Sequence, residues 1–200
     1  MSKGTGGSGS DREENERGGH GLAVGDRVPD FTAPLVRPSG GTEDVALSTL
    51  LEEGPVLLSF YTMDFSPDCV SEWCSFRDFD WFASGDDVQV VGISKSGPRL
   101  HRQFIDRLGL TFPLYTDPNL DVGEAFDVAY RAFGLFRRPR RSCFLVDTDR
   151  EVRYKWVGEH WLDPTRDTPP MGELYDAIQA ELDGDESGDG GDGGFGFGEF

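Results

Sequence analysis

Two short apolar runs, residues 56–61 and 88–93, constrain the fold of this chain more than any other feature of its sequence. Neither run contains a charged residue, which is typical of a strand covered on both faces rather than of a strand with one face in water. Strands of that kind belong to sheets that carry helices on both sides. The two runs therefore predict an α/β chain built around a central sheet.

The segments around these runs predict further elements. Residues 69–82, 99–108 and 122–129 have helical patterns, and Gly109 stands where the second of these helices should stop. Residues 112–115 predict a short strand, residues 143–146 and 152–156 predict a hairpin, and residues 171–182 predict a last helix. This alternation indicates a single domain in which helices flank the sheet.

The two ends of the chain differ in composition from the middle. Residues 1–20 lack apolar periodicity, and residues 183–200 are rich in Gly and acidic residues, so we expect both segments to be disordered. The expected domain is residues 21–182. No run approaches the ~18 apolar residues of a membrane span, and the N-terminus does not resemble a signal peptide. We therefore expect a cytoplasmic protein that does not act on a membrane.

The formal net charge of −18 limits the partners of the chain. Acidic residues also populate the middle of the sequence, so the acidic tail alone does not explain the charge. Such a surface repels the phosphates of nucleic acids and anionic lipids, which makes nucleic acid an unexpected partner. The composition resembles that of halophilic-type proteins from a salt-rich cytoplasm, where screening weakens self-repulsion.

Three cysteines, Cys69, Cys74 and Cys143, are too few and too odd in number for a secreted disulfide framework. The spacing of Cys69 and Cys74 does not suit zinc, and no His lies near them in the sequence, so we expect no metal site. Cys143 lies inside a predicted strand and is expected to be an apolar filler. His101, in a helical surface stretch, and His160, in a loop, are expected to have ordinary surface or packing roles.

The sequence around Cys69 predicts a reactive thiol. Ser66 is a favoured helix N-cap, and Pro67 suits the first helical position because no N–H partner is needed there. Cys69 then falls in the first turn, among unpaired N–H groups and at the positive end of the helix dipole. Both features favour the thiolate over the thiol, so Cys69 is interpreted as a nucleophile rather than as a packing residue.

These residues resemble the signature of the peroxiredoxins, most closely that of the bacterioferritin-comigratory or Q-type branch. Ser66 and Cys69 match the Thr/Ser and peroxidatic Cys of the signature, Glu72 matches a Glu that often follows, and Cys74 matches the resolving Cys of that branch. Arg141 matches the catalytic Arg of the family. Similar segments occur at residues 25–31, 74–78, 91–94 and 141–147, and the likeness covers residues 21–182.

The resemblance implies a thioredoxin-like fold with a central mixed β-sheet, and a thiol-dependent peroxidase active in antioxidant defence and cell redox homeostasis. Cys69 would reduce hydrogen peroxide and alkyl hydroperoxides and become a sulfenic acid, while Arg141 and Ser66 stabilise the leaving oxygen, with Glu72 in support. Cys74 would then form a disulfide with Cys69. A thioredoxin-like or other dithiol reductant would reduce that disulfide, without a cofactor, in a monomer or homodimer.

One position departs from the signature, because Thr62 stands where the family has Pro. This substitution adds an N–H group and loosens the backbone, which bears on the rate and the preferred substrate.

Two alternatives stay open: a thioredoxin-fold thiol-disulfide electron carrier, and a non-catalytic redoxin-like binding module. The first would favour Cys-x-x-Cys, which is absent. The basic cluster of residues 137–141 either balances nearby acids or attracts an anion or an acidic reductant.

Overall fold

The computed structural model describes residues 21–66, 69–70, 73–74, 76, 88–132, 136–158, 167 and 169–186. Residues 1–20 and 187–200, predicted to be disordered, lie outside this part of the chain. The elements run in the order β1 (Thr32–Val36), β2 (Thr42–Ala46), α1 (Leu47–Leu51), β3 (Val56–Phe60), β4 (Gln89–Ser94), α4 (Pro98–Leu108), β5 (Leu114–Thr116), α5 (Asp121–Ala125), β6 (Ala129–Ala132), β7 (Phe136–Pro139), β8 (Ser142–Val146), β9 (Val152–Val157) and α6 (Met171–Glu186).

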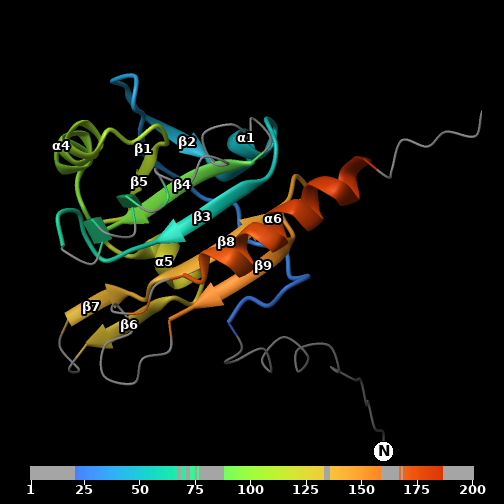
Figure 1. The fold of residues 1–200 in the computed structure, drawn as a ribbon. Coiled ribbons are helices and arrows are strands. Elements are labelled where there is room, and N and C mark those ends of the chain that lie inside the picture. Colours follow the sequence, from blue (N-terminus) through green and yellow to red (C-terminus); the bar gives the residue numbers. More distant parts are fainter. Residues whose placement is uncertain are drawn as a thin grey trace, which may run out of the picture.

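Seven strands form the central sheet in the order β2-β1-β5-β4-β3-β8-β9, and β6 and β7 form a separate two-stranded ribbon. The inner strands β3, β4 and β5 are parallel, whereas β1, β2, β8 and β9 join the sheet in antiparallel pairs. The sheet is therefore mixed, as predicted. Helices lie on both sides of it, with α6 running along β8 and β9 (Figure 1).

Two apolar clusters occupy the two faces of the sheet. One contains the buried residues of α1 and α5, and the other contains those of α4, α6 and the helical segment around Cys69. Alternate residues of β3 serve the two clusters, since Leu58 and Phe60 belong to the first, and Leu57 belongs to the second, as does Tyr61 just beyond the strand. All five residues of β3 are buried, which confirms the strand covered on both faces.

Several predicted bounds differ from the structure. The predicted helix over residues 122–129 ends at Ala125, and Ala129 already begins β6. Helix α6 continues to Glu186, beyond the predicted end at residue 182. The predictions missed α1, the β1–β2 hairpin and the β6–β7 ribbon. Within the described residues, no helix is long and apolar enough to cross a membrane.

Candidate active site

The chain after β3 forms a helix start that is capped by Ser66. The Ser66 carbonyl accepts a hydrogen bond from the N–H of Val70 at 2.9 Å, which is the first helical bond. The Ser66 hydroxyl accepts one from the N–H of Cys69 at 3.4 Å. Cys69, Val70, Trp73, Cys74 and Phe76 are all helical. This pairing is that of an N-cap, as the sequence predicted, and it puts Cys69 in the first turn.

Arg141, just before β8, meets Cys69 inside the protein. Its Nη2 donates a hydrogen bond to the Cys69 Sγ at 3.1 Å, and both residues have no exposed surface. Its Nη1 donates to the carbonyl of Asp167 at 3.5 Å. A buried guanidinium is stable only where acceptors surround it. A charged donor such as a guanidinium makes shorter and stronger hydrogen bonds than a neutral one.

The helix that carries Cys69 packs on the sheet through Trp73. The Trp73 ring makes an edge-to-face contact with Tyr61, with ring centroids 5.0 Å apart, and it also lies against Phe76 and Phe112. Gly92 on β4 makes room for it, because a Cβ at that position would lie 2.8 Å from the indole. Trp73 is therefore a buried packing residue of this helix.

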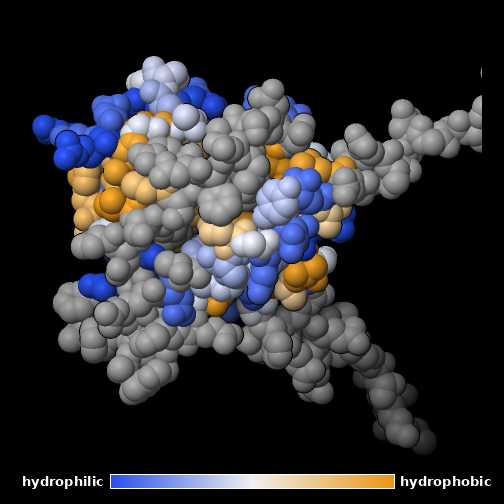
Figure 2. Space-filling view, in the orientation of Figure 1, coloured by the Kyte–Doolittle hydropathy of each residue, from blue (hydrophilic) through white to orange (hydrophobic). Residues whose placement is uncertain are grey.

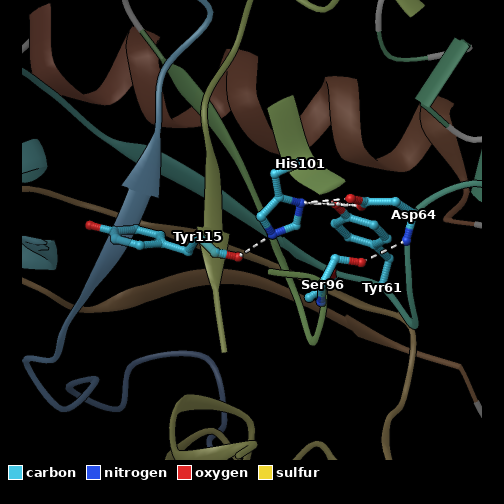
Figure 3. A network of polar contacts seen from close by, with 6 residues as sticks. Tyr61, Asp64, Ser96, His101 and Tyr115 are labelled. Atoms are coloured by element: carbon cyan, nitrogen blue, oxygen red, sulfur yellow. Dashed lines mark hydrogen bonds and ion pairs between the residues drawn. The ribbon is translucent and has the colours of Figure 1, made fainter. Parts of the chain in front are cut away.

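A buried polar network lies beside this packing (Figure 3). The Tyr61 hydroxyl donates to Asp64 Oδ1 at 2.6 Å, and His101 Nδ1 lies 3.0 Å from Asp64 Oδ2. His101 Nε2 lies 3.1 Å from the carbonyl oxygen of Tyr115, and the N–H of Asp64 donates to the Ser96 hydroxyl at 3.0 Å. Burial, followed by the charge of Asp64, raises the pKa of Tyr61 well above its usual value, so Tyr61 stays a donor.

The prediction of a surface position for His101 is wrong, because its side chain has no exposed surface. A helical pattern could have shown this. His101 precedes the buried Phe104 and Ile105 by three and four residues, which places all three on one face of α4. Asp64 was also missed, since a carboxylate in a loop carries no sign of burial in the sequence.

A cavity of about 640 Å³ lies next to the loop that leads to Cys69. Its lining combines the loop, the start of α4 and basic residues: Thr62, Met63, Lys95, Ser96, Gly97, Leu100, Arg137 and Arg138. Met63 and Phe65 of the loop are exposed apolar residues, and Figure 2 shows hydrophobic surface beside α4. Arg137 forms an ion pair with Glu124, so a neighbouring acid balances one charge of the basic cluster.

The remaining candidate residues occupy different settings. Cys74 is half-buried in the same helix as Cys69, and both are free thiols. Cys143 is buried on β8, where its Sγ lies 3.7 Å from the Ser59 hydroxyl of β3. Thr62 lines the cavity, whereas Glu72 lies outside the described residues. The structure thus brings Ser66, Cys69 and Arg141 together. Among the described residues, no group of three or more His, Cys, Asp or Glu could hold a metal ion.

Comparison with known proteins identifies the family of this chain. Residues 24–155 match the model of the AhpC/TSA family. The chain belongs to this family.

Relatives of this peroxiredoxin are identical to it at about a third of the aligned residues. A putative peroxiredoxin of Mycobacterium tuberculosis is 34% identical over 131 residues, which are 66% of this chain and 82% of the relative. The putative peroxiredoxin Bcp of Coxiella burnetii is 31% identical over 140 residues, 68% of this chain and 88% of the relative. The resemblance to the bacterioferritin-comigratory branch is confirmed.

Solved structures confirm the thioredoxin-like fold. The crystal structure of peroxidoxin BcpB from Mycobacterium tuberculosis is 31% identical, with a TM-score of 0.65, and the match covers 80% of this chain and 97% of that one. The structure of a PrxQ mutant from Xylella fastidiosa, 22% identical, has a TM-score of 0.66. This peroxiredoxin is a thiol-dependent peroxidase, which sets aside the electron carrier and the non-catalytic module. Its substrates are a peroxide and a thiol reductant.

Proposed function

We propose that Cys69 is the peroxidatic cysteine and that it reduces hydrogen peroxide and small alkyl hydroperoxides. The observation that carries this proposal is the 3.1 Å contact between Arg141 Nη2 and Cys69 Sγ in the buried first turn of a helix. A thiolate is stabilised by a nearby positive charge and by the start of a helix, and this position supplies both. Cys143 instead lies within strand β8, where its Sγ is 3.7 Å from the Ser59 hydroxyl.

The first step is the attack of Cys69 on the hydroperoxide. The thiolate sulfur of Cys69 attacks the terminal oxygen of the hydroperoxide, an S–O bond forms and the O–O bond breaks. The leaving oxygen departs with the electron pair and takes up a proton to become water or an alcohol. Arg141 lies at the sulfur and the Ser66 hydroxyl lies at the backbone N–H of Cys69, and we assign to both the stabilisation of the negative charge that moves onto that oxygen.

The second step assigns Cys74 as the resolving cysteine. Its thiolate attacks the sulfur of the Cys69 sulfenic acid, an S–S bond forms as the S–O bond breaks, and the hydroxide that leaves takes up a proton to become water. Five residues along an ideal helix correspond to about 140° of rotation and about 7.5 Å of rise. That separation exceeds the roughly 7 Å between Cα atoms that a disulfide tolerates. The helix start must therefore unwind before Cys69 and Cys74 can bond.

A thioredoxin-like or other dithiol protein then reduces the disulfide by exchange. Thr62 and Glu72 are assigned supporting roles, Thr62 in the loop beside the cavity and Glu72 in the signature that follows Cys69. We place the enzyme in the cytoplasm, as a monomer or homodimer. Substrates would reach Cys69 past the loop that contains Thr62. Thr62 carries a backbone N–H, which a Pro at this position would lack.

Peroxide turnover by three variants tests the assignment. With dithiothreitol or thioredoxin supplied, Cys69→Ser should abolish the consumption of hydrogen peroxide, because no nucleophile remains. Cys143→Ser is the matched control, since it alters a second buried thiol, on β8, and should keep most of the activity. Cys74→Ser should stop at the sulfenic acid or form mixed disulfides. Equal loss in Cys69→Ser and Cys143→Ser, with both folded, would contradict the proposal.

A further inference from the structure

We infer that His101 and Asp64 are positioning residues for the peroxidase reaction: their buried contact fixes the loop that holds Cys69 against Arg141. This inference rests on the proposed function of Cys69 and adds two residues that the signature does not contain. Three independent observations carry it, namely the hydrogen bonds of the pair, the backbone of Phe65, and the contacts of Tyr61.

Hydrogen bonds on both ring nitrogens fix the orientation of the His101 side chain. His101 Nε2 faces a carbonyl oxygen, which only accepts, so Nε2 must carry hydrogen. His101 Nδ1 lies 3.2 and 3.0 Å from the two oxygens of Asp64. Because an acceptor nitrogen would repel a carboxylate, a second proton lies between Nδ1 and Asp64. The pair is thus an imidazolium–carboxylate contact or its neutral equivalent, and both side chains are fully buried.

The contact holds a backbone that would not keep its shape alone. Phe65, between Asp64 and the N-cap Ser66, has φ = 60°, a left-handed conformation that a bulky side chain rarely adopts. Such a residue persists only where its surroundings fix it on both sides. Asp64 is held by His101 of α4 and by Ser96, and the Phe65 ring lies edge-to-face on Phe104 of α4, with centroids 5.2 Å apart. Helix α4 therefore fixes the loop.

Tyr61 connects the pair to the reacting sulfur. Its hydroxyl contacts both Asp64 and His101 Nδ1, at 2.6 and 3.4 Å, and its ring packs on Trp73, one turn after Cys69. The charge of a Cys69 thiolate also raises the pKa of Tyr61, after burial and Asp64, because the two groups lie close together. Figure 3 shows the Tyr61, Asp64 and His101 side chains pointing toward one another.

Releasing this contact should change the fate of Cys69 in a defined direction. With the loop loose, Cys69 would spend less time at Arg141 and react more slowly with peroxide. The helix start would unwind more readily, so the sulfenic acid would meet Cys74 sooner. It would then less often attack a second hydroperoxide, a step that forms another S–O bond, breaks another O–O bond and leaves a sulfinic acid and an alcohol or water.

Two substitutions of one residue test the inference. Asn places an amide nitrogen near the position of His101 Nδ1, whereas Gln places it near Nε2. His101→Gln should therefore lose the bond to Asp64 and slow the first step roughly ten- to a hundredfold. His101→Asn should keep that bond and recover most of the rate. Stopped-flow measurement of single-turnover oxidation gives the rate, and mass spectrometry after excess peroxide gives the ratio of sulfinic acid to disulfide.

The outcomes separate this inference from the assignment of Cys69. If His101→Gln and His101→Asn lose equal rate and keep the wild-type sulfinic ratio, while Cys69→Ser is inactive, the pair only supports the fold and the inference is wrong. If Cys69→Ser stays active, the proposed function itself fails. Asp64→Asn gives a second reading, because it removes the charge but keeps the N–H bond to Ser96. It should lower the sulfinic ratio as His101→Gln does.

Discussion

Arg141 is a fully buried cation whose guanidinium reaches both the sulfur of Cys69 and the carbonyl of Asp167. A lysine could supply the charge but not the planar fork that serves two acceptors at once. The charge is needed when the O–O bond breaks, since negative charge then moves onto the leaving oxygen. The two properties, charge and geometry, can be separated by substitution.

Arg141→Ala should lower the rate of peroxide reduction on the order of 10²-fold, the usual cost of losing one donor to a developing anion. Arg141→Lys should restore part of the rate, because it returns the charge without the second hydrogen bond. Single-turnover oxidation by hydrogen peroxide measures both. A wild-type rate in Arg141→Ala would remove Arg141 from the reaction, and circular dichroism establishes that the variants are folded.

Gly92 is a single position on which the packing under Cys69 depends. A Cβ there would lie 2.6 Å from Leu114 Cδ2 and 2.8 Å from the Trp73 ring, so Gly92→Ala must move Trp73. Overpacking of this kind costs about 1–3 kcal/mol. We expect that loss of stability in urea unfolding, together with a changed Trp emission spectrum. Gly172→Ala on α6 is the matched control, because no atom lies within 4 Å of its Cβ. Equal effects in the two variants would contradict the packing argument.

Part of this site could be predicted from the sequence because its parts are close in the chain. Ser66 and Cys69 form a cap and first turn, and local chemistry determines both. The partnership of Cys69 with Arg141 came from the family resemblance, since 72 residues separate them and no local rule joins them. His101 and Asp64 were missed because their contact arises only when α4 packs on the sheet beside the loop.

At the scale of elements, the helix start around Cys69 has two conflicting tasks. It must stay wound to keep Cys69 at Arg141, and it must unwind to let Cys74 reach the sulfenic acid. Both tasks can be met because helix ends open at low cost in free energy. The Thr62 position, which lacks the stiffness of Pro, lies at the base of the same loop.

Hydrogen exchange of the reduced and oxidised forms tests this transition. In the oxidised enzyme, amides of residues 66–78 should exchange faster than in the reduced enzyme, because the Cys69–Cys74 bond prevents the first turns from forming. Peptide mapping should find that disulfide. Helix α4 serves as an internal reference and should exchange alike in both forms. A stable Cys69 sulfenic acid with normal turnover in Cys74→Ser would instead indicate a one-cysteine mechanism.

The elements differ in how far the sequence predicts them, for a physical reason. Strands β3 and β4 have buried residues on both faces, so their apolar runs stand out. Strand β2 reads TEDVA with its first three residues exposed, and it is a strand because it pairs with β1, Pro34 opposite Asp44. Helix α1 has only five residues, too short for a periodic pattern. Elements defined by their neighbours leave little trace in their own sequence.

At the scale of the whole molecule, ion pairs offset only part of the negative charge. Among the described residues, Arg37 pairs with Glu43 at 2.9 Å, and Arg153 on β9 lies 2.7 Å from Asp147 and 3.5 Å from Glu181 of α6. Apart from the buried Asp147, these side chains are partly exposed, and a pair between partly exposed side chains contributes about 0–1 kcal/mol. The chain has 37 Asp and Glu residues against 19 Lys and Arg residues, so many acidic side chains have no basic counterpart. Repulsion should therefore dominate the long-range electrostatics of the folded state.

Salt should consequently stabilise the enzyme. The Debye length falls from ~10 Å at 0.1 M to ~3 Å at 1 M, which screens the repulsion between exposed acids as well as the few surface pairs. Because repulsion dominates, the melting temperature should rise with KCl by at least about 2–4 °C, the shift that corresponds to about 1 kcal/mol at this size. Asp44→Lys with Glu53→Lys changes the formal charge from −18 to −14, since each substitution replaces −1 by +1. That variant should melt higher at low salt and respond less to KCl. A flat or falling curve in the wild type would show that charge repulsion does not limit this fold, whatever the activity of Cys69.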